Sequence, residues 1–306
     1  MRTLRAVFLA FLAVASAAAG SAFAEGPNWK AVGEALGKTG TEMPGGVYRV
    51  GLPRTDLKVS LDGVQLKPSL ALGSWLAFQP MEGKAIVMGD LVLTESEITP
   101  VLTKLTEGGI KITALHNHLL RASPATFYMH VLGQGDAVKV AAVLHVALSL
   151  SGTPLPQVAS PGTQSQATGT TPAPDVDLDI DMVNQTLGAK GKVNGGVLQF
   201  SVPRAEKITE DGMEVPPAMG TAEAINFQPT GAGKVAVTGD FVLTVGEVNP
   251  VLQTLRENGI EITALHSHML NEQPRLFFMH FWANDDAKKL ASGLRAALDK
   301  VNVAKQ

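Results

Sequence analysis

Apolar and polar residues follow one another in a pattern that predicts short helices and strands in a fixed order. A helix is predicted over residues 28–36, where Asn28 can cap the start and Gly37 ends the helix. The strands that follow are predicted up to Pro53, around 57–66 with a turn at Asp62-Gly63, near 75–78, and over 84–93.

A helical stripe of apolar residues comes next, from Ile98 to Leu105. Thr94 and Glu97 form a capping-box pair, but Pro100 leaves two starts open. Either the helix begins after Thr99 with proline in its first turn, or a short turn precedes it and the axis bends. The pattern ends with strands over 110–118 and 126–132 and a closing helix over about 136–149, which is expected to bury Val138, Ala141, Ala142 and His145.

The whole series recurs about 150 residues later. Gly45-Gly46-Val47 matches Gly195-Gly196-Val197, and Gly89-Asp90 matches Gly239-Asp240. A repeat of this length is a duplicated domain rather than a solenoid unit. The order of elements predicts an α+β fold of tandem duplicated domains, each a mainly antiparallel sheet with helices packed on one face, related by a pseudo-twofold axis or a translation.

The predicted segments are a signal peptide over 1–24, a first repeat domain over 25–150, a Pro/Thr/Ser-rich linker over 151–174 and a second repeat domain over 175–306. Cleavage near Ala24 predicts a periplasmic or secreted protein, and no later segment is apolar over the length that a membrane span needs. The formal net charge of -3 argues against a nucleic-acid partner. The absence of cysteine excludes disulfides, thiolate zinc sites and iron–sulfur clusters.

Six of the seven histidines lie in two matching cassettes, which are His116, His118 and His130 in the first repeat and His266, His268 and His280 in the second. Since strand side chains alternate, the two histidines of each His-x-His share one face of the sheet. A hairpin turning at Ser123-Pro124 is expected to place His116 opposite His130 and His118 opposite Tyr128. The second cassette follows the same arithmetic, with His266 opposite His280 and His268 opposite Phe278.

Each trio of imidazoles is therefore predicted to share one ion or ligand, and zinc or copper suits such a set. The fuller aromatic surround of the second cassette predicts the stronger site there. A polar small-molecule ligand and a structural role for core histidines stay open beside metal binding. His145 has no counterpart in the second repeat and is expected to be structural or exposed.

Charged residues that repeat with the cassettes offer further chemistry. Asp90 and Asp240 follow the strand glycines and are candidates for a second-shell partner or a general base, with a turn or bulge role as the alternative. The glutamates of the capping boxes, Glu97 and Glu247, are expected to act as caps. The arginines at the matching strand ends, Arg54 and Arg204, are expected to be exposed or paired rather than to hold an anion.

The cassette Ala264-Leu265-His266-Ser267-His268-Met269-Leu270, continued by Phe278-Met279-His280-Phe281-Trp282, resembles the LppY/LpqO family of exported bacterial proteins. The likeness extends to Gly195-Gly196-Val197 and the Gly-Asp strand. It implies export and no particular reaction, and the lack of a cysteine after the signal departs from the lipoprotein members.

Together these patterns predict an exported soluble protein that binds a divalent transition metal through the duplicated cassettes. One alternative is a metal-dependent hydrolase acting on a small polar or envelope-derived substrate, with Asp90 or Asp240 as base. The other is a structural or interaction module with core histidines.

Overall fold

The computed structural model describes residues 26–81, 83–155 and 176–305. The predicted signal peptide and most of the predicted linker lie outside these residues. The first repeat contains α1 (Trp29–Leu36), β1 (Thr41–Met43), η1 (Pro44–Gly46), β2 (Val47–Pro53), β3 (Ser60–Leu61), β4 (Val64–Gln65), α2 (Pro68–Ala71), β5 (Gly73–Met81), β6 (Lys84–Leu93), α3 (Glu95–Glu107), β7 (Lys111–His116), β8 (Phe127–Gly135) and α4 (Ala137–Leu148).

The second repeat runs through the same order of principal elements. It contains α5 (Ile180–Leu187), β9 (Lys192–Asn194), β10 (Val197–Pro203), β11 (Thr209–Glu210), β12 (Met213–Glu214), η2 (Pro217–Met219), β13 (Ala222–Gly231), β14 (Lys234–Leu243), α6 (Val248–Glu257), β15 (Glu261–His266), β16 (Glu272–Gln273), β17 (Phe277–Asp286) and α7 (Ala287–Leu298). No helix of the described ranges is both long and apolar enough to cross a bilayer.

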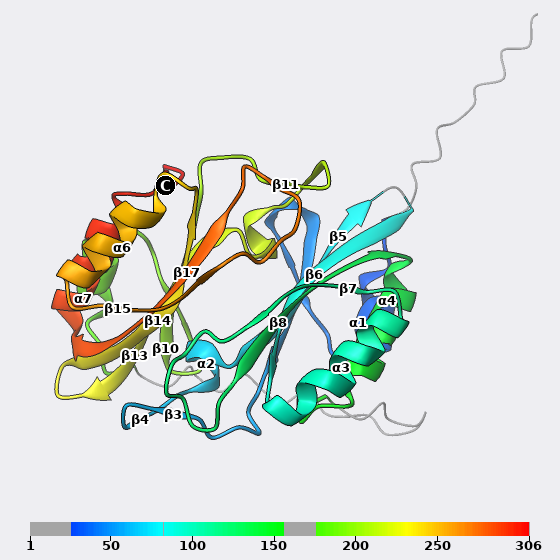
Figure 1. The fold of residues 1–306 in the computed structure, drawn as a ribbon, viewed down its shortest axis with the longest axis horizontal. Coiled ribbons are helices and arrows are strands. Elements are labelled where there is room, and N and C mark those ends of the chain that lie inside the picture. Colours follow the sequence, from blue (N-terminus) through cyan, green and yellow to red (C-terminus); the bar gives the residue numbers. More distant parts are fainter. Residues whose placement is uncertain (1–25, 82, 156–175, 306) are drawn as a thin grey trace, which may run out of the picture.

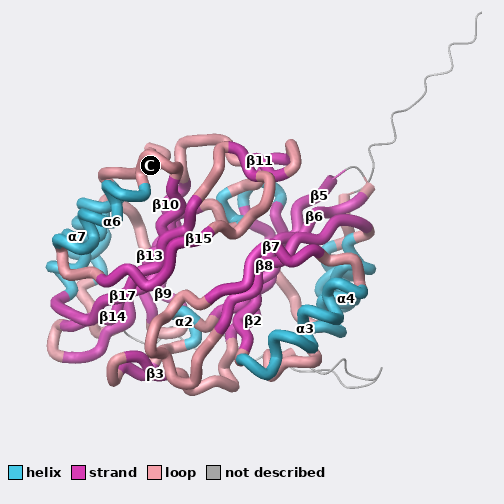
Figure 2. Tube along the Cα trace, in the orientation of Figure 1, coloured by secondary structure: helices cyan, strands magenta, loops and turns pink. Residues whose placement is uncertain are grey.

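Each repeat forms one six-stranded sheet, ordered β1-β2-β5-β6-β8-β7 in the first and β9-β10-β13-β14-β17-β15 in the second. All strand pairs in both sheets are antiparallel. Helices cover the outer face of each sheet, and the inner faces of the two sheets oppose one another (Figures 1 and 2). The molecule is thus four layers, helix, sheet, sheet, helix, and the predicted α+β duplication is confirmed.

Side-chain alternation along the strands builds these layers. On β6, Val87 and Leu91 pack with the helices, while Ile86 and Met88 join a cluster with residues of the second repeat. Each repeat has a core of its own under its helices, and two further clusters mix residues of both repeats. The strands are therefore apolar on both faces, as expected for a sheet covered on both sides.

The helix ends follow the capping residues. Asn28 accepts a hydrogen bond from the backbone N–H of Ala31, and Gly37 ends α1 at φ 79°, a conformation that favours glycine. The two predicted alternatives for the helix start are decided differently in the two repeats, since α3 begins at Glu95 and keeps Pro100 inside, whereas a short turn over residues 245–247 precedes α6 at Val248. The carboxylate of Glu97 accepts a hydrogen bond of 2.8 Å from the backbone N–H of Thr94, as the capping box predicts.

The closing helix α4 buries a different face from the predicted one. Ala141 is buried, but Val138 and Ala142 are exposed. The buried stripe is instead formed by Ala137, Ala141, Leu144, Ala147 and Leu148.

Each repeat sends an arm across the other repeat's sheet. The first arm, residues 55–72, carries Leu66 and Leu70 into a cluster with Val197 and Trp282. The second arm, residues 205–220, carries Val215 and Met219 into a cluster with residues of the first sheet. Polar groups reinforce the exchange, because Gln228 Nε2 donates to the carbonyl of Gln65 and Arg49 donates to the carbonyl of Ala218.

Candidate metal centre

Four of the cassette histidines lie on strands, His116, His130, His266 and His280, and the stretch of chain just beyond β7 and β15 carries His118 and His268. The strand register differs from the predicted one. His116 is opposite Tyr128 and Ala114 is opposite His130, so the pairing is displaced by two residues. In the second repeat His266 is opposite Phe278 in the same way. A displacement of two preserves the face of every side chain, so the histidines still converge.

The two trios form one cluster rather than two separate sites. The ring centroids of His116 and His266 are 3.6 Å apart, those of His118 and His280 are 3.5 Å apart, and those of His130 and His268 are 3.7 Å apart. Each of these stacked pairs joins one repeat to the other. The nitrogens of each trio lie close enough together to share one ion, as predicted, and each trio also lies against the histidines of the other repeat.

The contacts between the trios are reciprocal. His118 of the first repeat meets His280 of the second, and the equivalent His268 meets His130. A twofold relation produces such an exchange of equivalent contacts, whereas a translation between the repeats would not make the contacts reciprocal. The repeats are thus related by a pseudo-twofold axis that passes near the stacked pair of His116 and His266.

Two groups of four histidines have ligand nitrogens that lie within 4.8 Å of one another. Group one is His116, His118, His130 and His268, and group two is His118, His266, His268 and His280. Each group takes three members from one repeat and its fourth from the other. His118 and His268 belong to both groups, and we call them the crossing histidines. Four nitrogens at this spacing suit a four-coordinate transition metal.

Buried nitrogen atoms without hydrogen-bond partners mark the cluster. Within the described residues, the Nε2 atoms of all six cassette histidines are buried and make no hydrogen bond. Buried polar atoms are normally satisfied, and an unsatisfied one costs about 1–3 kcal/mol. Six such atoms in one place are therefore poorly explained by a structural role.

Burial also keeps these imidazoles in the form that binds metals. Burial, together with the neighbouring imidazole of His266, lowers the pKa of His116 to about 3. Burial lowers the pKa of His266 to about 4. The pKa values of His118, His130, His268 and His280 are held well below the usual range by burial, with further lowering from nearby imidazoles. At neutral pH all six rings are neutral, so each has a nitrogen lone pair to offer.

The ring of His280 is oriented by the backbone. Its Nδ1 lies 3.0 Å from the carbonyl oxygen of Gly239. In the neutral ring Nδ1–H donates to this carbonyl, which leaves the lone pair on Nε2. A second hydrogen bond of this kind commonly fixes the tautomer of metal-binding histidines.

Asp90 and Asp240 lie inside the cluster, in the middle of β6 and β14. Each is paired in register with a cassette histidine, Asp90 with His130 and Asp240 with His280. Asp90 Oδ1 is 3.7 Å from His130 Nε2, and Asp240 Oδ1 is 3.8 Å from His280 Nε2. The pairing is regular at both positions, so the alternative of a bulge or turn role is wrong.

Burial governs the protonation of these two carboxyls. It raises the pKa of Asp90 to about 8, and Arg49 opposes the rise. Burial raises the pKa of Asp240 well above its usual range, and the Asp90 carboxyl raises it further. The two carboxyls are thus electrostatically coupled across the interface between the repeats.

Aromatic rings hold the crossing histidines in place. His118 is stacked on Tyr128 at 3.5 Å between ring centroids, and His268 on Phe278 at 3.6 Å. The Tyr128 hydroxyl donates to the carbonyl of Ala71 in the first arm. Tyr128 is therefore satisfied elsewhere and acts as a wall of the site.

The repeated arginines and glutamates serve the fold. Arg54 is fully buried and donates to Asp56, to Glu97 and to the carbonyl of Val92. Arg204 makes the equivalent bonds to Glu206 and Glu247. Both arginines are paired, as expected, and their partners Glu97 and Glu247 also accept the capping hydrogen bonds of Thr94 and Thr244.

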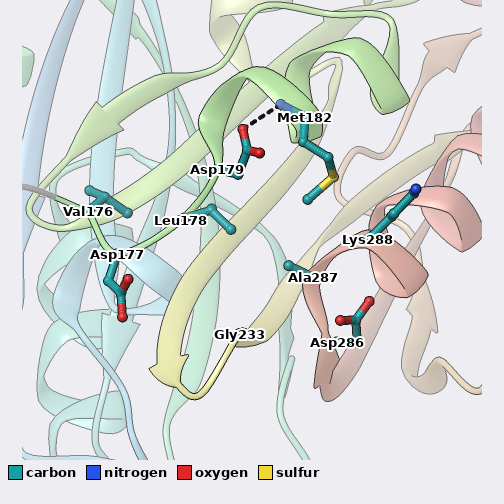
Figure 3. A pocket seen from close by; sticks show the side chains of 9 residues that line it. All are labelled: Val176, Asp177, Leu178, Asp179, Met182, Gly233, Asp286, Ala287 and Lys288. Atoms are coloured by element: carbon teal, nitrogen blue, oxygen red, sulfur yellow. Dashed lines mark hydrogen bonds between the residues drawn. The ribbon is translucent and has the colours of Figure 1, made fainter.

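The remaining histidine and a surface pocket lie outside the cluster. His145 Nδ1 lies 2.9 Å from the carbonyl oxygen of Leu36, which ties α4 to α1 as a structural residue. Figure 3 shows a pocket of about 600 Å³ whose acids include Asp179 and Asp286. These two carboxylates accept the backbone N–H of Met182 and Lys289, so they are helix caps.

Sequence comparison identifies the repeat. A family model described as Domain of Unknown Function (DUF1259) matches residues 30–150 and again residues 181–300. No curated protein matches the sequence.

Two solved structures share a weak likeness with the chain. The trimeric bacterial microcompartment shell protein PduB is 9% identical, with 84% of this chain and 87% of that chain covered and a TM-score of 0.20. EtuB from Clostridium kluyveri is 8% identical, with 85% and 88% covered and a TM-score of 0.20. A likeness at this level carries no argument about function.

Proposed function

We propose that this chain, which belongs to the family described as Domain of Unknown Function (DUF1259) and carries its domain twice, is an exported protein that binds a divalent transition metal between its two repeats. The observation that carries the proposal is the convergence of six buried, unbonded histidine Nε2 atoms. Neutral imidazole is the common protein ligand for zinc, copper and nickel.

Zinc or copper is the first choice of metal. All the candidate nitrogen ligands are imidazoles, and the sequence contains no cysteine that would supply a thiolate. Four imidazoles fit a tetrahedral zinc ion, and the same nitrogens suit copper. The site is built from both repeats, so metal binding is expected to require the full chain.

Elemental analysis of protein purified without a histidine tag tests the proposal. The wild type is expected to retain zinc or copper, and the double variant His118→Ala/His268→Ala is expected to lose it. His145→Gln is the matched control, because it removes the one histidine outside the cluster. Failure of the wild type to take up micromolar zinc or copper would leave the interaction-module alternative.

A metal-dependent hydrolase is the second candidate, favoured by the carboxyl oxygens beside the ligand nitrogens. In that reading a three-histidine set would hold the ion, the ion would supply an activated water, and Asp90 or Asp240 would act as the base. Hydrolysis of small ester or amide substrates by the zinc-loaded wild type, lost in Asp90→Asn/Asp240→Asn with zinc still bound, would support this candidate. Absence of turnover would leave binding alone.

Export remains a prediction from the sequence. The mass of the mature protein recovered from a periplasmic or culture fraction would test it. Cleavage near Ala24 is expected, as is the absence of a lipid, because the sequence has no cysteine. The LppY/LpqO resemblance also stays a prediction beside the family that the repeats show.

A further inference from the structure

Resting on the proposed metal binding, we infer that the centre takes one divalent ion per chain and that Asp90 and Asp240 are the carboxylates that balance its charge. The inference concerns stoichiometry and two binding residues beyond the histidine ligands. It is carried by the overlap of the two histidine groups and by the placement of the two carboxyls.

The overlap limits the number of ions. The two groups share both crossing histidines, His118 and His268, so an ion that occupies one complete group removes two ligands from the other. In each of these two rings Nε2 is a buried atom without a hydrogen-bond partner, and it points to the ligand position. A second ion could then find only His266 and His280, or His116 and His130.

The two carboxyls lie on either side of the pseudo-twofold axis, one in each repeat. Asp90 is 7% exposed, and its Oδ1, like that of Asp240, is buried without a hydrogen-bond partner among the described residues. Each carboxyl lies beside the Nε2 atom of its paired histidine, at 3.7 and 3.8 Å. Both oxygens therefore face the same ligand atoms that define the metal site.

Charge then selects one ion. A buried charge is costly unless an opposite charge neutralises it. Six neutral imidazoles contribute no charge, so two carboxylates match the charge of one divalent ion, and Arg49 near Asp90 adds one positive charge. A second divalent ion would add two further positive charges between the sheets.

One difference between the surroundings of the two carboxyls is a cation near Asp90. Arg49 lies over the ring of Trp75, its Cζ 4.1 Å from the ring centroid, and Trp75 is paired in register with Asp90. In the second repeat the position of Arg49 is taken by Gln199, and that of Trp75 by Ala224. Asp240 therefore lacks this competing cation and is expected to contribute more to metal binding than Asp90.

Zinc titration by calorimetry, with bound zinc measured by elemental analysis, tests the inference on the full-length chain. The wild type is expected to bind one zinc per chain. Asp240→Asn is expected to weaken binding by roughly 10- to 100-fold, as loss of an outer partner of a metal ligand does, and Asp90→Asn by less. Arg49→Gln removes the competing cation and is expected to tighten binding, and this variant leaves the histidines and both carboxyls in place.

Glu95→Gln is the matched control, since it removes one carboxylate from an exposed position of the first repeat. Two zinc ions per chain, or unchanged affinity in Asp90→Asn/Asp240→Asn, would overturn the inference while metal binding itself stands. If the double variant kept its affinity, zinc would be lost only in the histidine variants, and the histidines alone would hold the ion. A wild type that binds no zinc would overturn the proposed function, and the inference with it.

Discussion

The overlap of the two histidine groups predicts unequal effects of single substitutions. His118→Ala removes a member of both groups, so each is left with three ligands. His116→Ala removes a member of group one only and leaves group two complete. The same contrast holds between His268→Ala and His266→Ala in the other repeat.

The magnitudes follow from counting ligand sets. If the two groups are equivalent positions for one ion, His116→Ala leaves one position instead of two. The affinity then falls about twofold, and the binding free energy is weakened by about 0.4 kcal/mol. His118→Ala is expected to cost more than about 100-fold in affinity, or roughly 2.7 kcal/mol, because even the loss of an outer partner of a metal ligand costs about 10- to 100-fold.

Competition against a zinc chelator of known affinity would measure these differences. Thermal unfolding of each metal-free variant is needed beside it, so that loss of folding is not mistaken for loss of a ligand. Equal losses for His116→Ala and His118→Ala would refute the reasoning, since the crossing histidines would then have no special place.

Three further outcomes are expected for stability. Arg204→Met leaves the fully buried Glu223 and the largely buried Glu247 without their cation, so urea unfolding should show a loss of about 3–5 kcal/mol, whereas a loss below about 1 kcal/mol would contradict the buried network. Leu70→Ala, in the first arm and 1% exposed, is expected to lose about 2–5 kcal/mol of unfolding free energy in the same assay, and no change would mean that the arm does not contribute to the interface. The metal-free protein is expected to lose stability as the pH falls from about 6.5 toward 4, because burial lowers the pKa of all six cassette histidines and the unfolded chain then binds more protons, by up to about 1.4 kcal/mol per pH unit for each group. The raised pKa values of Asp90, Asp240 and Glu223 act in the opposite direction but on fewer groups, so a flat profile across this range would contradict the shifts of the histidines.

Local physical chemistry made much of the fold predictable from the sequence. Capping residues such as Asn28 mark helix starts, and glycines such as Gly37 mark helix ends, because both act on their own neighbours in the chain. The strand over 84–93 was predicted with the bounds of β6, since alternation and its flanking turn residues are local signals. Proline was the main exception, because the packing of α3 tolerates Pro100 inside the helix.

For the candidate site, the sequence predicted only which face of the sheet each side chain occupies. Period-two alternation predicted that His116 and His118 share a face and that Met129 faces away from it, independent of register, although β7 ends at His116 and His118 follows in a bend. The register itself differed by two residues, because it depends on how the chain between β7 and β8 turns. A displacement of two left the convergence of the trio intact, whereas a displacement of one would have reversed the face of every residue.

The sequence by itself determined which side chains can bind a metal, and the tertiary structure decided which of them meet. His268 joins His116, His118 and His130 across more than a hundred residues of chain, and no period or spacing encodes that contact. It results from two sheets whose inner faces are apolar and must be buried, with exchanged arms that fix their relative position. Because a twofold relation places equivalent residues around one axis, duplication of a three-histidine cassette produced a shared cluster, in which each repeat supplies the fourth histidine of the other repeat's group.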